Sequence, residues 1–201
     1  MSLTRRALHE RLREATRAPH RLLDHHPLLA PLVRAEVAPA QYGAALAALH
    51  GVHAPLEAAI TAFLERHPGL MDYAPRRKLP ALQADLSALG WPPDRTPVAA
   101  DLRDLVLSSL PQLVGILYTL EGSTLGARVM SNHLRTQVAS RNFPQRFLSV
   151  YGDSTDARWA EFLAWAEQHC PEDQYATAEQ AAVALFDAIR HHLDAVAALA
   201  E

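Results

Sequence analysis

The sequence is poor in the features that mark several large classes of protein. It holds one cysteine, Cys170, in 201 residues, which excludes an intrachain disulfide and a cysteine-rich metal site. Its net charge of -3 gives no reason to expect nucleic acid as a partner. The apolar run 113–120 is far shorter than the roughly 20 residues that span a bilayer, and no basic stretch followed by an apolar run opens the chain. We therefore expect a soluble, cytoplasmic protein with no membrane partner.

The residues that are present favour helices. Apolar residues make up 49% of the chain and aromatic residues only 6%, and the apolar set is mostly alanine and leucine, which are strong helix formers. No segment shows sustained alternation of apolar and polar residues, as a strand would. No repeat or linker divides the chain. The sequence therefore predicts a single all-α domain over residues 1–201, built as a helical bundle.

Proline, glycine and the helical spacing of apolar residues set the expected helix limits. Pro19 is expected to kink its helix, and Pro55 to kink or divide its own. Ser154 and Thr177 are candidate N-caps. The predicted helices contain 8–22, a short piece between 26 and 39, 39–67, 78–89, 98–107, 111–138, 145–150, 154–168 and 177–199.

A first group of polar residues lies near one side of the first predicted helix. Arg13 precedes His20 by seven residues, and Asp24 follows it by four, so all three are on one side. A neutral imidazole facing a cavity is a good iron ligand, and Asp24 would accept a hydrogen bond from its other ring nitrogen. The competing interpretation, which this pattern alone favours, is an ordinary, partly buried histidine.

A second group lies inside the long helix predicted from Pro111. Gly122 and Gly126 are four residues apart on one helix face, and each costs about 1 kcal/mol relative to alanine. At two such positions, either a second helix or a flat ligand can approach the helix backbone closely. The spacing alone favours the second helix.

Both groups lie in segments that resemble a known family. Residues 12–20, LREATRAPH, resemble the proximal helix of heme oxygenases, in which a leucine-x-x-alanine-threonine stretch leads to the iron-ligating histidine. Residues 117–126, LYTLEGSTLG, resemble the glycine-rich distal helix of the bacterial, biliverdin-producing branch. Tyr151-Gly152, Arg158-Trp159 and Phe162 resemble the region that follows it.

The resemblance implies that heme lies between the two helices as both substrate and cofactor. His20 would be the iron ligand and Asp24 its hydrogen-bond partner. Gly122, Ser123 and Gly126 would form the distal, catalytic side. The implied reaction is the oxidation of heme to biliverdin, CO and ferrous iron, using O₂ and external electrons.

The sequence departs from the animal enzymes at Ser123, where they place an aspartate that organises distal water. A hydroxyl carries no charge, so proton delivery would depend on other groups. Arg76, Arg77 and Lys78 are candidates, and the sequence does not choose among them.

The heme propionates need cationic or hydroxyl partners. The resemblance offers Arg13, Tyr118 and Arg128, with Arg158 as a further candidate. Phe186 matches an aromatic residue of the family's pocket wall, although plain core packing explains it equally well.

Electrons must come from outside, because the chain has no flavin or nicotinamide fingerprint. A basic N-terminal segment is either a solvated helix face or a docking patch for an acidic donor such as ferredoxin or flavodoxin. Its residues are Arg5, Arg6, Arg11, Arg13, Arg17 and Arg21.

Two rival functions stay open: a heme-binding carrier or sensor on the same fold without turnover, and a non-heme relative. A di-iron site is not expected, because the chain lacks Glu-x-x-His pairs. His50 and His53 form a possible metal pair without an obvious third ligand.

Overall fold

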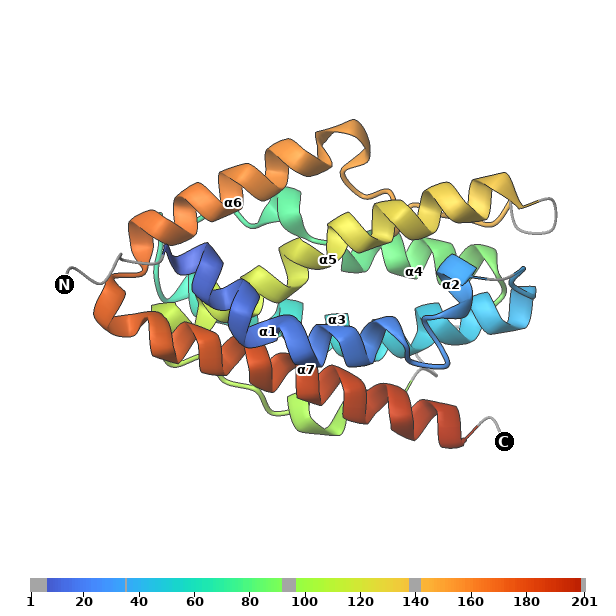
Figure 1. Cartoon of the computed structure of the whole chain (residues 1–201), viewed down its shortest axis with the longest axis horizontal. Coiled ribbons are helices and arrows are strands. Elements are labelled where there is room, and N and C mark those ends of the chain that lie inside the picture. Colours follow the sequence, from blue (N-terminus) through green and yellow to red (C-terminus); the bar gives the residue numbers. More distant parts are fainter. Residues whose placement is uncertain (1–6, 35, 92–96, 138–141, 200–201) are drawn as a thin grey trace.

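The computed structural model describes residues 7–34, 36–91, 97–137 and 142–199, and within them it contains helices and no strand (Figure 1). The all-α prediction is therefore confirmed for these residues. The α-helices are α1 (Leu8–Asp24), α2 (Pro31–Arg34), α3 (Pro39–Glu65), α4 (Leu79–Ala88), α5 (Leu110–Thr136), α6 (Thr155–His169) and α7 (Tyr175–Ala198). Short 3₁₀ turns are η1 (Ala74–Arg76), η3 (Ala100–Leu102), η4 (Gly152–Ser154) and η5 (Glu172–Gln174).

Helix α5 is the central element, and it packs most extensively on α7 and then on α6. The closest approach to α7 is at Gly115, where an added Cβ would lie 2.2 Å from the backbone oxygen of Ala178. Helix α1 also packs on α7. The hydrophobic core runs continuously through these contacts, and Leu12, Leu117 and Leu193 are completely buried in it.

Helix α3 passes through Pro55 without dividing, so of the two expected outcomes, a kink or a division, the division is excluded. A proline has no N–H, so the carbonyl four residues earlier, that of Gly51, loses its helical donor. The backbone N–H of Ala99 donates to this oxygen instead, at 3.0 Å. An added Cβ at Gly51 would lie 2.0 Å from the backbone oxygen of Pro97. Because Gly51 has no side chain, the segment 97–99 can approach α3 closely enough for Ala99 to donate to the Gly51 carbonyl. Helix α1 likewise continues past Pro19.

Two short predicted helices are wrong. Residues 98–107 contain only η3: the backbone N–H of Ala99 donates to Gly51 of α3, and its carbonyl accepts from Leu102 within the segment. Residues 145–150 form hydrogen-bonded turns. There Asp85 accepts the N–H groups of Arg146 at 3.1 Å and Phe147 at 2.8 Å. Six residues are too few to form a helix cooperatively, so these contacts from other elements decide the backbone.

One of the two predicted N-cap positions is confirmed and the other is wrong. Ser154 is the N-cap residue of α6, but its side chain makes no capping hydrogen bond. Thr177 lies inside α7, which begins two residues earlier. None of the described helices is both long and apolar enough to cross a membrane.

Candidate functional site

The two helices that carry the predicted site meet near Tyr118. The Tyr118 hydroxyl on α5 lies near Thr16 on α1, and burial raises the pKa of this phenol. The His9 ring lies 6.3 Å from the Tyr118 ring, centroid to centroid. In Figure 1 the two helices cross and then separate toward their C-terminal ends. His20 follows Thr16 on α1, and Gly122 and Gly126 follow Tyr118 on α5, so all three lie on the diverging halves.

His20 and Asp24 are paired as their spacing predicts. The ring Nδ1 donates to Asp24 Oδ2 at 3.0 Å. This bond fixes the tautomer, because a carboxylate only accepts, and so the lone pair of the neutral ring is on Nε2. The Phe186 ring of α7 lies 5.7 Å from the His20 ring and is buried. The His20 side chain is 59% exposed, more than the competing interpretation of a partly buried histidine implies.

The two distal glycines are not explained by helix packing. A Cβ at Gly126 would meet no heavy atom within 4 Å, and a Cβ at Gly122 would meet Trp159 at an ordinary 3.6 Å. The close helix contact on α5 is at Gly115 instead. A close helix contact therefore does not account for either glycine, and the ligand surface stays a prediction.

Ser123 lies between these glycines and is exposed. Its hydroxyl donates to the backbone oxygen of Leu120 at 2.8 Å, within the same helix. The hydroxyl proton is thus engaged by the backbone, while the oxygen keeps lone pairs that accept hydrogen bonds.

A buried ionic network lies directly beside Gly122, and it was not predicted from the sequence. Glu121 is 1% exposed. Its carboxylate accepts from Lys78 Nζ at 2.7 Å and from Arg76 at 2.7 Å. The Tyr151 hydroxyl donates to the same carboxylate at 3.0 Å. Burial lowers the pKa of Lys78, and Glu121 opposes that shift. The network therefore fixes the buried face of α5 one residue before the first distal glycine.

A second buried carboxylate completes this region. Glu57 on α3 accepts the backbone N–H groups of Lys78 at 2.6 Å and Leu79 at 2.7 Å, which begin α4. The Arg77 side chain donates to Glu57 at 3.3 Å. The three basic residues considered for proton delivery are thus all engaged by buried carboxylates. The sequence signal was three consecutive basic residues together with two glutamates inside apolar helices.

The predicted propionate partners do not gather at one point. Arg13 is exposed and lies near Tyr118. Arg128 makes a two-pronged ion pair with Asp156, at 2.8 and 2.9 Å. Arg158 pairs with Glu161 on its own helix at 3.2 Å. Tyr118 and Arg13 thus lie at the helix crossing, whereas Arg128 and Arg158 are engaged by carboxylates of α6.

The basic N-terminal segment is partly neutralised. Arg11 pairs with Glu179, and Arg17 pairs with Glu14 at 2.6 Å. Arg13 and Arg21 are exposed on the same helix. Arg5 and Arg6 lie outside the described residues.

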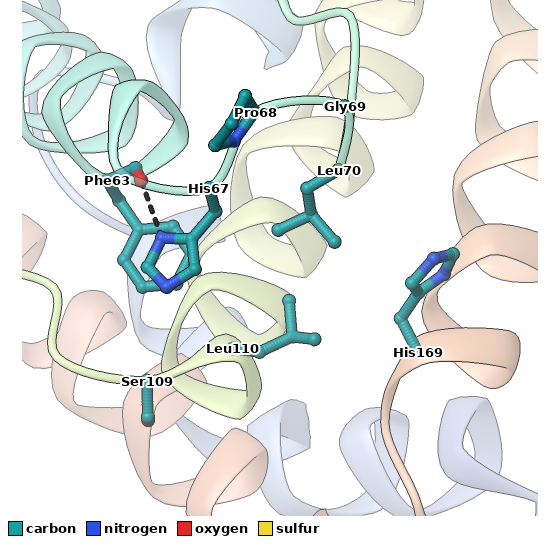
Figure 2. Close-up of a pocket in the computed structure, with 8 residues that line it drawn as sticks. All are labelled: Phe63, His67, Pro68, Gly69, Leu70, Ser109, Leu110 and His169. Atoms are coloured by element: carbon teal, nitrogen blue, oxygen red, sulfur yellow. Dashed lines mark hydrogen bonds between the residues drawn. The ribbon is translucent and has the colours of Figure 1, made fainter.

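A separate open pocket of about 460 Å³ lies between the ends of α3, α5 and α6 (Figure 2). His67 and His169 lie on opposite sides of it, with Leu70 and Leu110 between them. Each imidazole Nδ1 donates to the backbone oxygen four residues earlier, at 2.8 Å in both cases. Leu110 is about 18 Å along α5 from Gly122. This pocket is therefore not the site predicted from the sequence.

The chain belongs to the heme oxygenase family, whose model, described as "Heme oxygenase", matches residues 6–193. It is 36% identical over 94 residues to a heme oxygenase of Xanthomonas campestris pv. campestris, an alignment that covers 46% of this chain and 52% of that protein. The chain thus spans about half the length of this curated relative.

Two solved structures share the fold. The heme oxygenase of Leptospira interrogans superposes with a TM-score of 0.75 at 15% identity, covering 94% of this chain and 98% of that one. Heme oxygenase-1 of the cyanobacterium Synechocystis, solved in complex with heme, gives 0.73 at 14% identity, covering 95% and 92%. These likenesses confirm the predicted fold.

Proposed function

We propose that this protein binds heme through His20 and oxidises it to biliverdin, CO and ferrous iron, using O₂ and electrons from an external donor. The observation that carries the proposal is the His20–Asp24 pair at 3.0 Å on α1, the helix whose sequence resembles the proximal helix of the family. The bond occupies Nδ1 and directs the ligating lone pair to Nε2. A neutral imidazole held this way suits an iron that binds O₂.

The side chains around this pair fit a flat, apolar ring with two carboxylates. Gly126 offers bare backbone with no heavy atom within 4 Å of an added Cβ, so a ring can approach the helix. Phe186 offers an aromatic surface beside His20. Arg13, exposed near the Tyr118 hydroxyl, offers a cation and a hydroxyl for one propionate. We assign the second propionate to Arg128, which would exchange part of its pairing with Asp156.

Bound heme supplies the iron that binds O₂ and the ring that is oxidised. The chain's own residues position that ring and control access to it. His20 would ligate the iron, Asp24 would hold the Nδ1 proton, and Gly126 would leave the backbone of α5 open to the ring. The Ser123 oxygen retains acceptor capacity and is proposed to hold a water molecule there. Arg76 and Lys78 act indirectly, by holding α5 through Glu121.

The proposed electron donor is an acidic protein such as ferredoxin or flavodoxin. Arg13 and Arg21 are exposed on α1, the helix that carries His20. Cationic side chains beside a redox site steer an acidic partner and accelerate association at low salt. Reduction by such a donor should therefore slow as ionic strength rises.

Heme titration tests the ligand assignment. Purified protein is expected to develop a Soret band with one equivalent of hemin, and His20→Ala is expected to lose the histidine-ligated spectrum. His191→Ala is the matched control, because His191 is similarly exposed and also pairs with an aspartate at 3.0 Å. An unchanged spectrum in His20→Ala, or the same loss in His191→Ala, would refute His20 as the ligand.

One observation favours the alternative of a heme carrier without turnover. Ser123 replaces the acidic residue of the animal enzymes, and its proton is bonded to its own helix. A reductant system under air separates the two functions. Biliverdin with released iron supports the oxygenase, whereas a stable oxygen complex supports the carrier.

A further inference from the structure

Aromatic side chains from three helices meet beside Gly122. Trp159 of α6 lies 5.5 Å from Tyr118 of α5 and 5.8 Å from His9 of α1, measured between ring centroids. We call His9, Tyr118 and Trp159 the aromatic wall. Phe162 stacks on the far side of Trp159 at 5.6 Å and is completely buried. Trp159 therefore packs against a core residue, and a shift of its indole toward the core would displace Phe162.

The wall covers only one of the two distal glycines. The Cη2 and Cζ3 atoms of Trp159 lie 3.6 and 3.7 Å from where a Cβ on Gly122 would be. Gly126, one helical turn or about 6 Å further along α5, has no heavy atom within 4 Å of its Cβ position. The space along this helix face is thus closed by the indole edge at Gly122 and open at Gly126.

Trp159 also differs from a core residue. It is only half-buried, whereas its neighbour Phe162 is completely enclosed. An indole at the boundary of the core, with its edge against a glycine backbone, is placed to contact a molecule lying on that backbone.

We infer that Trp159 is a specificity-determining residue that sets how the heme ring is seated. This inference rests on the proposed function. A ring lying on α5 would meet the indole edge at Gly122, whereas no heavy atom lies within 4 Å of a Cβ position on Gly126, so its in-plane position would be limited on the Gly122 side. The propionates break the symmetry of the ring, so each rotation about the iron axis presents a different side to the wall. Trp159 thereby selects which bridging carbon lies under the distal glycines and is oxidised.

The test uses Trp159→Ala, which removes the wall, and Trp159→Phe, which keeps an aromatic ring of smaller reach. Trp165→Phe is the matched control on the same helix, since the Trp165 indole donates to the backbone oxygen of Leu70 at 3.2 Å and makes no contact with a distal glycine. Two readouts are needed. Proton NMR of the hemin complex with cyanide reports seating through the ring-methyl shifts, without turnover. Chromatography of the biliverdin isomers reports the carbon attacked.

We expect Trp159→Ala to add a second set of methyl resonances and to change the isomer ratio by about two- to tenfold, the range that the loss of one aromatic contact gives. Trp159→Phe is expected to give a smaller change of the same kind, and Trp165→Phe none. Should both Trp159 variants keep the parent methyl pattern and isomer ratio, the inference is overturned. Failure of the parent protein to bind hemin would instead overturn the proposed function.

Discussion

Gly126→Ala should have opposite effects on two measured quantities: the free energy of unfolding without heme and the affinity for heme. The residue is exposed in the interior of α5, and its added Cβ meets nothing within 4 Å. Alanine is favoured over glycine in such a position by about 1 kcal/mol. For a chain of this size, a gain of that amount corresponds to a rise in Tm of about 2–4 °C. The heme-free variant should therefore be more stable than the parent protein.

The same methyl group should weaken heme binding, because it occupies the surface on which the ring is proposed to lie. Urea unfolding and hemin titration of one preparation measure both effects. Gly115→Ala is the control, since its Cβ would lie 2.2 Å from the Ala178 oxygen and should destabilise by about 1–3 kcal/mol through overpacking. The reasoning is refuted if Gly126→Ala lowers stability without heme, or if it binds hemin as tightly as the parent.

Two further predictions concern buried charge and pH. Glu121→Gln leaves Lys78 and Arg76 without their carboxylate and should cost about 3–5 kcal/mol in urea unfolding. Glu161→Gln, whose carboxylate is 56% exposed, should change stability by less than about 1 kcal/mol, and equal losses would contradict the assignment. Burial lowers the pKa of His53 to about 3, helped by the charges of Lys78 and His50. The unfolded chain then binds the extra proton below about pH 6.5, so stability should fall by up to about 1.4 kcal/mol per pH unit from there toward pH 3. His53→Leu should reduce that slope by one proton, and an unchanged slope would exclude His53 as its source.

Much of the helical framework follows from local sequence. Pro39 begins α3 at the predicted residue, and α5 begins at Leu110, one residue before the predicted Pro111. The His20–Asp24 bond follows from i,i+4 spacing on one helix. The helix starts and this hydrogen bond depend only on residues a few positions apart, so they can be predicted from the sequence.

Features that depend on distant segments could not be predicted in this way. Glu121 pairs with residues more than forty positions earlier in the chain, and helical periodicity gives no information about which segment brings a partner. The glycines of α5 show the same limit. Gly115 and Gly126 look alike as residues, but a Cβ on the first would meet the backbone of α7 and a Cβ on the second would meet no heavy atom within 4 Å. Only the packing of the helices separates a structural glycine from a candidate ligand surface.

The carbonyl of Gly51 has a wider role than repairing one helix. By accepting the Ala99 N–H it fixes the segment that enters η3, and Asp101 in that turn bonds His191 of α7 at 3.0 Å. The carbonyl that Pro55 leaves without a helical donor thus begins a chain of hydrogen bonds that joins α3 to α7 through the segment 99–102. Replacing Pro55 by alanine would therefore not simply restore a helix. The N–H of the new alanine would compete with the Ala99 N–H for the Gly51 oxygen. The hydrogen bonding within α3 would improve, and the connection between α3 and α7 would weaken.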